Sequence, residues 1–299
     1  MAVTETLPDL SRITTAGTTT VLNRKVYLLA LTFFALSCTV GERRQTTVTR
    51  SWPAEGIRNL KVTEVNGSLS VKAGASDHIS LVARVRHRGT RVDKDDPNRG
   101  YFKSEIDGDT LRISQRRSGR VHIVFPLFGH SRPHIDYELE VPSTIALELK
   151  TVNGRITTRG TEGEAELVTV NGGIDAETAG IRELYAKAVN GQVRAKFLRD
   201  FNGAKLKTVN GRVEAILPSS ASFTCNLTQV NGDFEASFPL SIHSHPGSRR
   251  VSGEVNGGRY QLQITTVNGD VEVQHLSVPL VPPVPEVKPV PPVPPPPTS

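Results

Sequence analysis

Apolar and polar residues alternate in short blocks along this chain, and the blocks recur around one tripeptide, Val-Asn-Gly. Counted from the Asn, most copies have apolar residues four and six positions before it and three and five positions after it. A period of two is typical of β-strands with one buried face. The pattern therefore predicts a strand, a turn at Asn-Gly and a second strand in each repeat.

The tripeptide occurs eight times in the chain. From Asn153 to Asn231 successive copies lie 18, 19, 20 and 21 residues apart. A nearly constant period of this size is typical of repeat architectures. The predicted structural turn residues are Asn66, Gly67, Asn153, Gly154, Asn171, Gly172, Asn190, Gly191, Asn210, Gly211, Asn231, Gly232, Asn256, Gly257, Asn268 and Gly269.

Asn and Gly suit a turn because both tolerate a positive φ. Glycine has no Cβ, and the short asparagine side chain forms local hydrogen bonds. The Val before each Asn is also apolar, which breaks the alternation and indicates a corner or a β-bulge. We therefore expect special backbone geometry at every copy of the tripeptide.

Two all-β architectures fit this pattern. In an antiparallel β-meander or sandwich, each Asn-Gly pair closes a hairpin. In a β-solenoid of two-strand coils of about 20 residues, each pair forms a corner, and equivalent residues stack from coil to coil. We favour the solenoid because stacking requires the same apolar columns in every copy, and because it lets the asparagines form an amide ladder. Aromatic residues make up only 5% of the chain, which fits a thin aliphatic core.

The period fails in three places. Between the first two copies, residues 75–146 still alternate like strands, and we expect irregular or longer coils there that cap the N-terminal end. Residues 239–248 are expected to form an inserted loop. The last step, to Asn268, is only 12 residues long and predicts a terminal, atypical coil.

The chain divides into four predicted segments. Residues 1–38 are a polar lead followed by a signal peptide, 39–50 a tether, 51–276 the β-solenoid domain and 277–299 a disordered tail. The tail consists mostly of Pro and Val, a composition typical of an extended spacer that does not pack as a domain.

The N-terminal segment has the pattern of an export signal. Arg24 and Lys25 precede an apolar run of about a dozen residues that ends in Ser37 and Cys38. This run is too short for a transmembrane helix. Residues 35–38 resemble a bacterial lipobox, so we predict lipidation of Cys38; the alternative is an ordinary cleaved signal.

The chain carries a net charge of +6, with a pI near 9.4. Basic proteins attract anionic surfaces. We predict a contact with an anionic glycan or envelope polymer through a basic N-terminal region, and a membrane contact through the lipid anchor. Nucleic acid is not expected because aromatic residues are not interleaved with the basic ones. The predicted contact residues are Arg84, Arg86, Arg88, Arg116 and Arg117.

No set of reactive residues stands out. The sequence has no recognisable nucleophile motif and no phosphate loop, so we expect no enzyme, no cofactor and no metal site. Position four after the Asn carries several carboxylates that could bind Ca²⁺ or a sugar, although a solvated face is the default. These residues are Thr157, Asp175, Arg194, Glu214, Glu235 and Glu272. Cys225 falls in an apolar column and is expected to be a buried hydrophobe.

The run from Val141 to Ile156, followed by recurring Leu-x-Thr-Val-Asn-Gly-x-Val, resembles a bacterial adhesin-like domain family catalogued as DUF4097. The resemblance covers residues 51–274. It implies a β-solenoid-like envelope protein without established catalytic residues.

The sequence thus predicts an exported, lipid-anchored protein that acts as a binding or structural surface in the bacterial cell envelope, in the periplasm or at the outer membrane. Two alternatives stay open. One is a polysaccharide-acting β-helix enzyme, and the other is a periplasmic sensor or interaction module. The oligomeric state and the ligand do not follow from the sequence.

Overall fold

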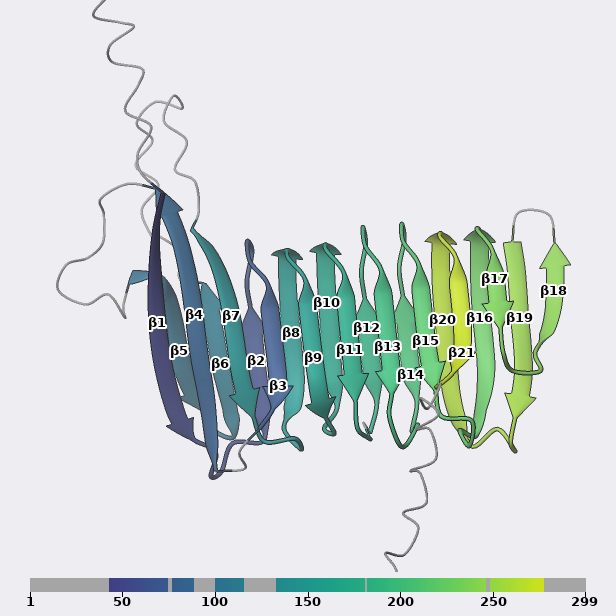
Figure 1. The fold of residues 1–299 in the computed structure, drawn as a ribbon, viewed down its shortest axis with the longest axis horizontal. Coiled ribbons are helices and arrows are strands. Elements are labelled where there is room, and N and C mark those ends of the chain that lie inside the picture. The colour runs from purple at the N-terminus through teal and green to yellow at the C-terminus, as the bar shows by residue number, and fades with distance from the viewer. Residues whose placement is uncertain are drawn as a thin grey trace, which may run out of the picture.

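The chain forms two long β-sheets that lie face to face, as the computed structural model shows (Figure 1). The structure describes residues 43–74, 77–88, 100–115, 133–180, 182–245 and 248–276. One sheet has ten strands, in the spatial order β1 (Arg43–Pro53), β4 (His78–Arg88), β7 (His134–Val141), β3 (Leu69–Ala73), β9 (Ile156–Thr161), β11 (Ile174–Thr178), β13 (Val193–Phe197), β15 (Val213–Leu217), β21 (Val271–His275) and β17 (Phe234–Ala236). The other has eleven, in the order β18 (Ser241–His245), β19 (Ser248–Val255), β16 (Phe223–Asn231), β20 (Tyr260–Asn268), β14 (Ala204–Lys207), β12 (Leu184–Lys187), β10 (Ala165–Asn171), β8 (Ala146–Asn153), β2 (Asn59–Thr63), β6 (Thr110–Gln115) and β5 (Phe102–Asp107).

Each repeat is one coil of a β-solenoid. Its first strand lies in the eleven-stranded sheet, the chain turns at Asn-Gly, and its second strand lies in the ten-stranded sheet. Neighbouring coils pair in parallel and in register, so that Leu149 lies opposite Leu167 and Ile156 opposite Ile174. The solenoid prediction is therefore confirmed, and the antiparallel hairpin reading is wrong for the repeats.

The core is the thin layer between the two sheets. The columns four before and three after the Asn meet there, and Leu149, Leu167, Ile174 and Val193 are each at most 2% exposed. Small side chains such as Ala195 form the column five after the Asn in the middle coils. Burial of each Val, Leu or Ile side chain contributes about 1.5–3 kcal/mol, so the stacked columns hold the coils together.

At the corner a polar residue is buried and the apolar residue after it is exposed. These are the Thr two positions before the Asn and the Val one position before it. Thr151 is buried and donates its hydroxyl hydrogen to the carbonyl oxygen of Gly67 in the preceding coil, at 3.1 Å. Thr169 makes the equivalent bond to Gly154, at 3.0 Å. Because the threonine points inward, the Val that follows it points outward. The alternation of buried and exposed positions therefore continues through the Val, and no bulge is needed to place it.

Glycine is required at the corner for a second reason besides the predicted positive φ, which Gly67, Gly211, Gly232, Gly257 and Gly269 do have. Among the described residues only Asn256 has a positive φ outside glycine, at 49°, so the ladder asparagines do not use the left-handed region. A Cβ added to Gly172 would lie 2.0 Å from the carbonyl oxygen of Gly154, and one added to Gly191 would lie 1.9 Å from that of Gly172. The corner glycines are small because successive coils touch there.

Antiparallel strands form the two ends of the stack, and β6 and β7, which pair in parallel with β2 and β3, form the expected irregular coil next to the N-terminal end. At the N-terminal end β4 pairs antiparallel with β1 and with β7, and β5 pairs antiparallel with β6. The predicted tether over residues 39–50 is wrong from Arg43 onward, because this residue begins β1. At the other end residues 241–255 form the antiparallel pair β18–β19, so the loop predicted over 239–248 is wrong where these strands lie.

The last repeat is not the terminal coil. β20 pairs in parallel with β14 on one side and with β16 on the other, and β21 lies between β15 and β17. The antiparallel strand β19 occupies the outer edge of β16, so the returning chain takes the inner edge. The prediction of a terminal, atypical coil at Asn268 is therefore wrong.

Candidate functional site

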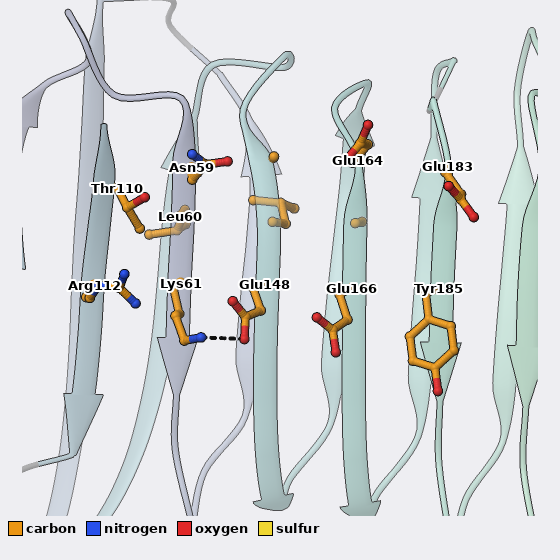
Figure 2. Close-up of a pocket in the computed structure, with 13 residues that line it drawn as sticks. Asn59, Leu60, Lys61, Thr110, Arg112, Glu148, Glu164, Glu166, Glu183 and Tyr185 are labelled. Atoms are coloured by element: carbon orange, nitrogen blue, oxygen red, sulfur yellow. Dashed lines mark hydrogen bonds and ion pairs between the residues drawn. The ribbon is translucent and has the colours of Figure 1, made fainter. Parts of the chain in front are cut away.

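A shallow groove of about 500 Å³ lies on the outer face of the eleven-stranded sheet (Figure 2). It spans β6, β2, β8, β10 and the start of β12. Strand alternation turns its side chains away from the core, while the neighbouring residues in each strand are buried. Its polar lining consists of Asn59, Lys61, Thr110, Arg112, Glu148, Glu164, Glu166, Glu183 and Tyr185.

A charge network crosses the centre of this groove. Lys61 Nζ lies 2.6 Å from Glu148 Oε1, and Lys150 Nζ lies 2.8 Å from the same oxygen and 2.9 Å from Glu166 Oε1. Burial opposes ionisation of Glu148, but the hydrogen bonds from Lys150 and Lys61 outweigh it and lower the pKa of the carboxyl. The hydrogen bond to Glu148 raises the pKa of Lys150. Glu148 and Lys150 are therefore charged at neutral pH.

Two carboxylates and one aromatic ring at the rim of the groove are available to contact a ligand. Glu164 and Glu183 have no ion-pair partner among the described residues, and the ring of Tyr185 stands on the sheet beside them (Figure 2). Carboxylates accept hydrogen bonds from hydroxyl groups, lysines donate them, and an aromatic ring packs against an apolar face. This mixture suits a polyhydroxylated ligand such as a sugar. It does not contain a nucleophile paired with a base.

The asparagines form a continuous amide ladder along one edge of the stack. Six side-chain Nδ2 groups each donate to the Oδ1 of a neighbouring coil at 2.8–3.0 Å, and Asn66 at the end of the ladder only accepts. The ladder prediction is therefore correct for seven of the eight copies, in the spatial order Asn66, Asn153, Asn171, Asn190, Asn210, Asn268 and Asn231. Asn256 lies outside the ladder, in the turn between β19 and β20, and donates to the carbonyl oxygens of Ser219 and Ala221.

The predicted charge stripe exists on the outer face of the ten-stranded sheet. Asp175 pairs in register with Thr157 and Arg194, and Glu214 follows Arg194 on the next strand. The row then continues through Glu272 to Glu235. Arg194 lies 3.3 Å from Glu214, Arg159 lies 2.8 Å from Asp175 and Arg212 lies 3.7 Å from Glu272, so arginines neutralise part of this mainly acidic row. In the described part of the chain, no group of three or more His, Cys, Asp and Glu side chains is placed to hold a metal ion.

The basic contact residues lie at the N-terminal end of the ten-stranded sheet. Arg84 on β4 forms an ion pair with Glu138 on β7, and Arg86 Nη2 lies 2.6 Å from Asp136 Oδ2. Their charges are thus partly neutralised by the adjacent strand. The side chain of Arg88 and the whole of Arg116 and Arg117 lie outside the described residues.

Of the two cysteines, only Cys225 lies in the part of the chain that the structure describes. Cys38 and the predicted signal and tail segments lie outside the described residues. Cys225 is completely buried in β16, and burial raises the pKa of its thiol to about 12. Its predicted place in an apolar column is confirmed, and it is not a nucleophile at neutral pH.

Sequence reasoning missed the groove, although the signal for it was present. The position five before the Asn faces outward in the seven repeats of the ladder, so Lys61, Glu148, Glu166, Tyr185 and Lys205 form one row across neighbouring strands. The repeat alignment would have revealed this row if the outward positions had been read like the inward ones.

No curated protein matches this chain significantly. Among solved structures, it is similar to a proposed cell adhesion protein from Clostridium sporogenes, with 10% identity, a TM-score of 0.42, and coverage of 78% of this chain and 100% of that one. It is also similar to a proposed adhesin from Bacteroides fragilis, with 11% identity, a TM-score of 0.38, and coverage of 76% and 97%. With TM-scores below 0.5, neither likeness supports an inference about function.

The described residues include no helix that is long and apolar enough to cross a membrane. The family model described as Toastrack DUF4097 matches residues 30–274, which include every strand of both sheets except the last residue of β21. The adhesin-like family resemblance seen in the sequence is thereby confirmed. The chain belongs to the Toastrack DUF4097 family.

Proposed function

We propose that this protein is an exported, lipid-anchored and non-catalytic component of the bacterial cell envelope that acts as an adhesin-like binding surface. The observation that supports this most directly is the regular order of its outer faces. Outward positions repeat in register from strand to strand at roughly 4.8 Å, which suits a long polymeric partner better than a single small molecule.

The proposed partner is an anionic glycan or envelope polymer that contacts the basic N-terminal region. Arg84 and Arg86 stand on β4 in this region, and both expose about half of their side-chain surface. The groove lies on the opposite sheet and is a separate feature, because its carboxylates Glu164 and Glu183, which have no ion-pair partner among the described residues, would repel an anionic polymer.

The polymer contact is tested by retention of the full-length protein on immobilised heparin, a polyanionic glycan. The variant R84Q/R86Q should elute at clearly lower salt than the wild type. The matched control is R159Q/R199Q, which removes two arginines that also form ion pairs on outer surfaces. Equal shifts for both variants would mean that retention follows net charge alone and would contradict a specific arginine surface.

The export part has its own test. We expect the intact mass of the protein from the membrane fraction to show a diacylglyceryl group on Cys38 as the mature N-terminus. A full-length chain in the soluble fraction that starts at Met1 would refute both export and anchoring.

A further inference from the structure

A row of exposed valines runs along the corner of the eleven-stranded sheet, beside the asparagine ladder. Five of them expose between 36% and 42% of their surface, which is unusual for stacked apolar side chains at equivalent positions. With coils roughly 4.8 Å apart, the row is about 29 Å long. In spatial order it consists of Val65, Val152, Val170, Val189, Val209, Val267 and Val230.

A basic patch lies next to the middle of this row, in the coils of Val189 and Val209. Lys187 and Lys207 are register partners on β12 and β14, and Lys205 stands two residues away from Lys207 on the same outer face. None of the three has an ion-pair partner among the described residues. The strands β12, β14, β20 and β16 contain no Asp or Glu at all.

Adjacent like charges on neighbouring strands are destabilising when nothing offsets them. In the N-terminal half of the same sheet the lysine charges are offset, because Lys61 and Lys150 are both paired with Glu148. The unpaired lysines and the exposed valines therefore both lack a partner in the part of the chain that the structure describes. Their shared position points to one external surface that is apolar and anionic.

We propose that the valine row and the lysine patch dock onto an anionic lipid surface. Lysines attract anionic headgroups, and an apolar row at the edge of a flat slab can enter the boundary between headgroups and acyl chains. The ladder lowers the free-energy cost of removing the asparagine side chains from water. Each interior asparagine already pairs its oxygen and one N–H with neighbouring coils. An anionic glycan would use the lysines but leave the valines in water.

The experiment measures binding of the full-length protein to vesicles of phosphatidylcholine with 30% phosphatidylglycerol, at low and moderate salt. Every protein carries Cys38→Ser, so that lipidation does not contribute. The variant K187Q/K205Q/K207Q should bind about a hundredfold more weakly, since each lysine near an anionic surface contributes about fivefold. The variant V170T/V209T/V267T should bind about tenfold more weakly, with its β-branched shape retained.

The matched control, K72Q/R194Q/K196Q, removes the same charge from the outer face of the other sheet. It should bind within about threefold of the parent protein, since these residues do not face the lipid in the proposed pose. All variants are checked for native folding by circular dichroism.

Three results would overturn the proposal. One is unchanged binding of the lysine variant, and the second is an equal loss in the control. The third is a loss confined to the lysine variant with none for the valine variant, which would indicate a purely electrostatic site for an anionic polymer. The proposed polymer contact is tested separately, because the heparin experiment changes only Arg84 and Arg86.

Discussion

The close approach of successive coils at the corner glycines makes a sharp prediction for Gly172→Ala. The added methyl group would lie 2.0 Å from the carbonyl oxygen of Gly154, whereas ordinary contacts begin at 3.4 Å. Both partners are backbone atoms in a parallel stack, so no flexible side chain can move away. The coils must separate locally.

The cost of this separation can be worked out from the contacts at the corner. Gly154 N–H donates to Asn171 O and Gly172 N–H to Asn190 O, both at 3.1 Å, and Asn171 Nδ2 donates to Asn153 Oδ1 at 2.9 Å. Overpacking costs about 1–3 kcal/mol, and weakening two of these hydrogen bonds adds about 1 kcal/mol each. We expect Gly172→Ala to lower the free energy of unfolding by about 3–5 kcal/mol.

The neighbouring residue provides a matched control. A methyl group on Gly173 would lie 3.3 Å from the carbonyl oxygen of Gln192, which a shift of a few tenths of an ångström relieves. Alanine also restricts the unfolded chain, which offsets part of the cost. Gly173→Ala should therefore change the free energy of unfolding by less than about 1 kcal/mol.

The assay is urea denaturation, followed by far-UV circular dichroism for the whole stack and by fluorescence of Trp52, the only tryptophan, for the N-terminal end. Coincident transitions would justify a two-state fit. If Gly172→Ala and Gly173→Ala unfold at the same urea concentration, close coil approach is not what requires glycine at the corner.

Three further predictions follow from the ladder, the buried carboxyl and the buried thiol. Asn190→Ala should cost about 1–2 kcal/mol in urea unfolding, because Asn190 makes two amide hydrogen bonds; no loss would show that the exposed ladder contributes nothing to stability. Burial raises the pKa of Glu64 above 4.5, so the wild type should lose stability relative to Glu64→Gln as pH rises from about 4.5 through the raised folded pKa, and a difference independent of pH would contradict this. In a Cys38→Ser background, Cys225 should react with a thiol reagent at pH 8 only after unfolding, and rapid labelling of the native protein would refute its burial.

The repeat alone favoured the solenoid over the hairpin architecture, because parallel stacking forces equivalent residues into common columns. Leu149 and Leu167 share a column in the sequence and lie opposite each other in the sheet. The same reasoning found the asparagine ladder and the charge stripe through Asp175 and Glu214. Each of these features depends on a position within one coil that recurs in every coil. Aligning the copies is therefore sufficient to predict them.

The sequence misjudged what depends on contacts between coils. Thr151 and Val152 exchange their expected positions because a buried hydroxyl finds the carbonyl oxygen of Gly67, which only the stacked neighbour supplies. The corner glycines Gly172 and Gly191, which have no positive φ, are explained by a clash across coils. The groove and the unpaired lysines arise because strands that are distant in sequence align their outward positions.

Only the tertiary structure decided the order of the last coils. The sequence places the copy at Asn268 last, but the antiparallel strand β19 already occupies the outer edge of β16, and β20 therefore lies between β14 and β16. A parallel edge accepts any strand of matching register, so the repeat motif by itself does not specify its neighbour. The sequence determined the shape of each coil, and competition for sheet edges decided how the coils are arranged.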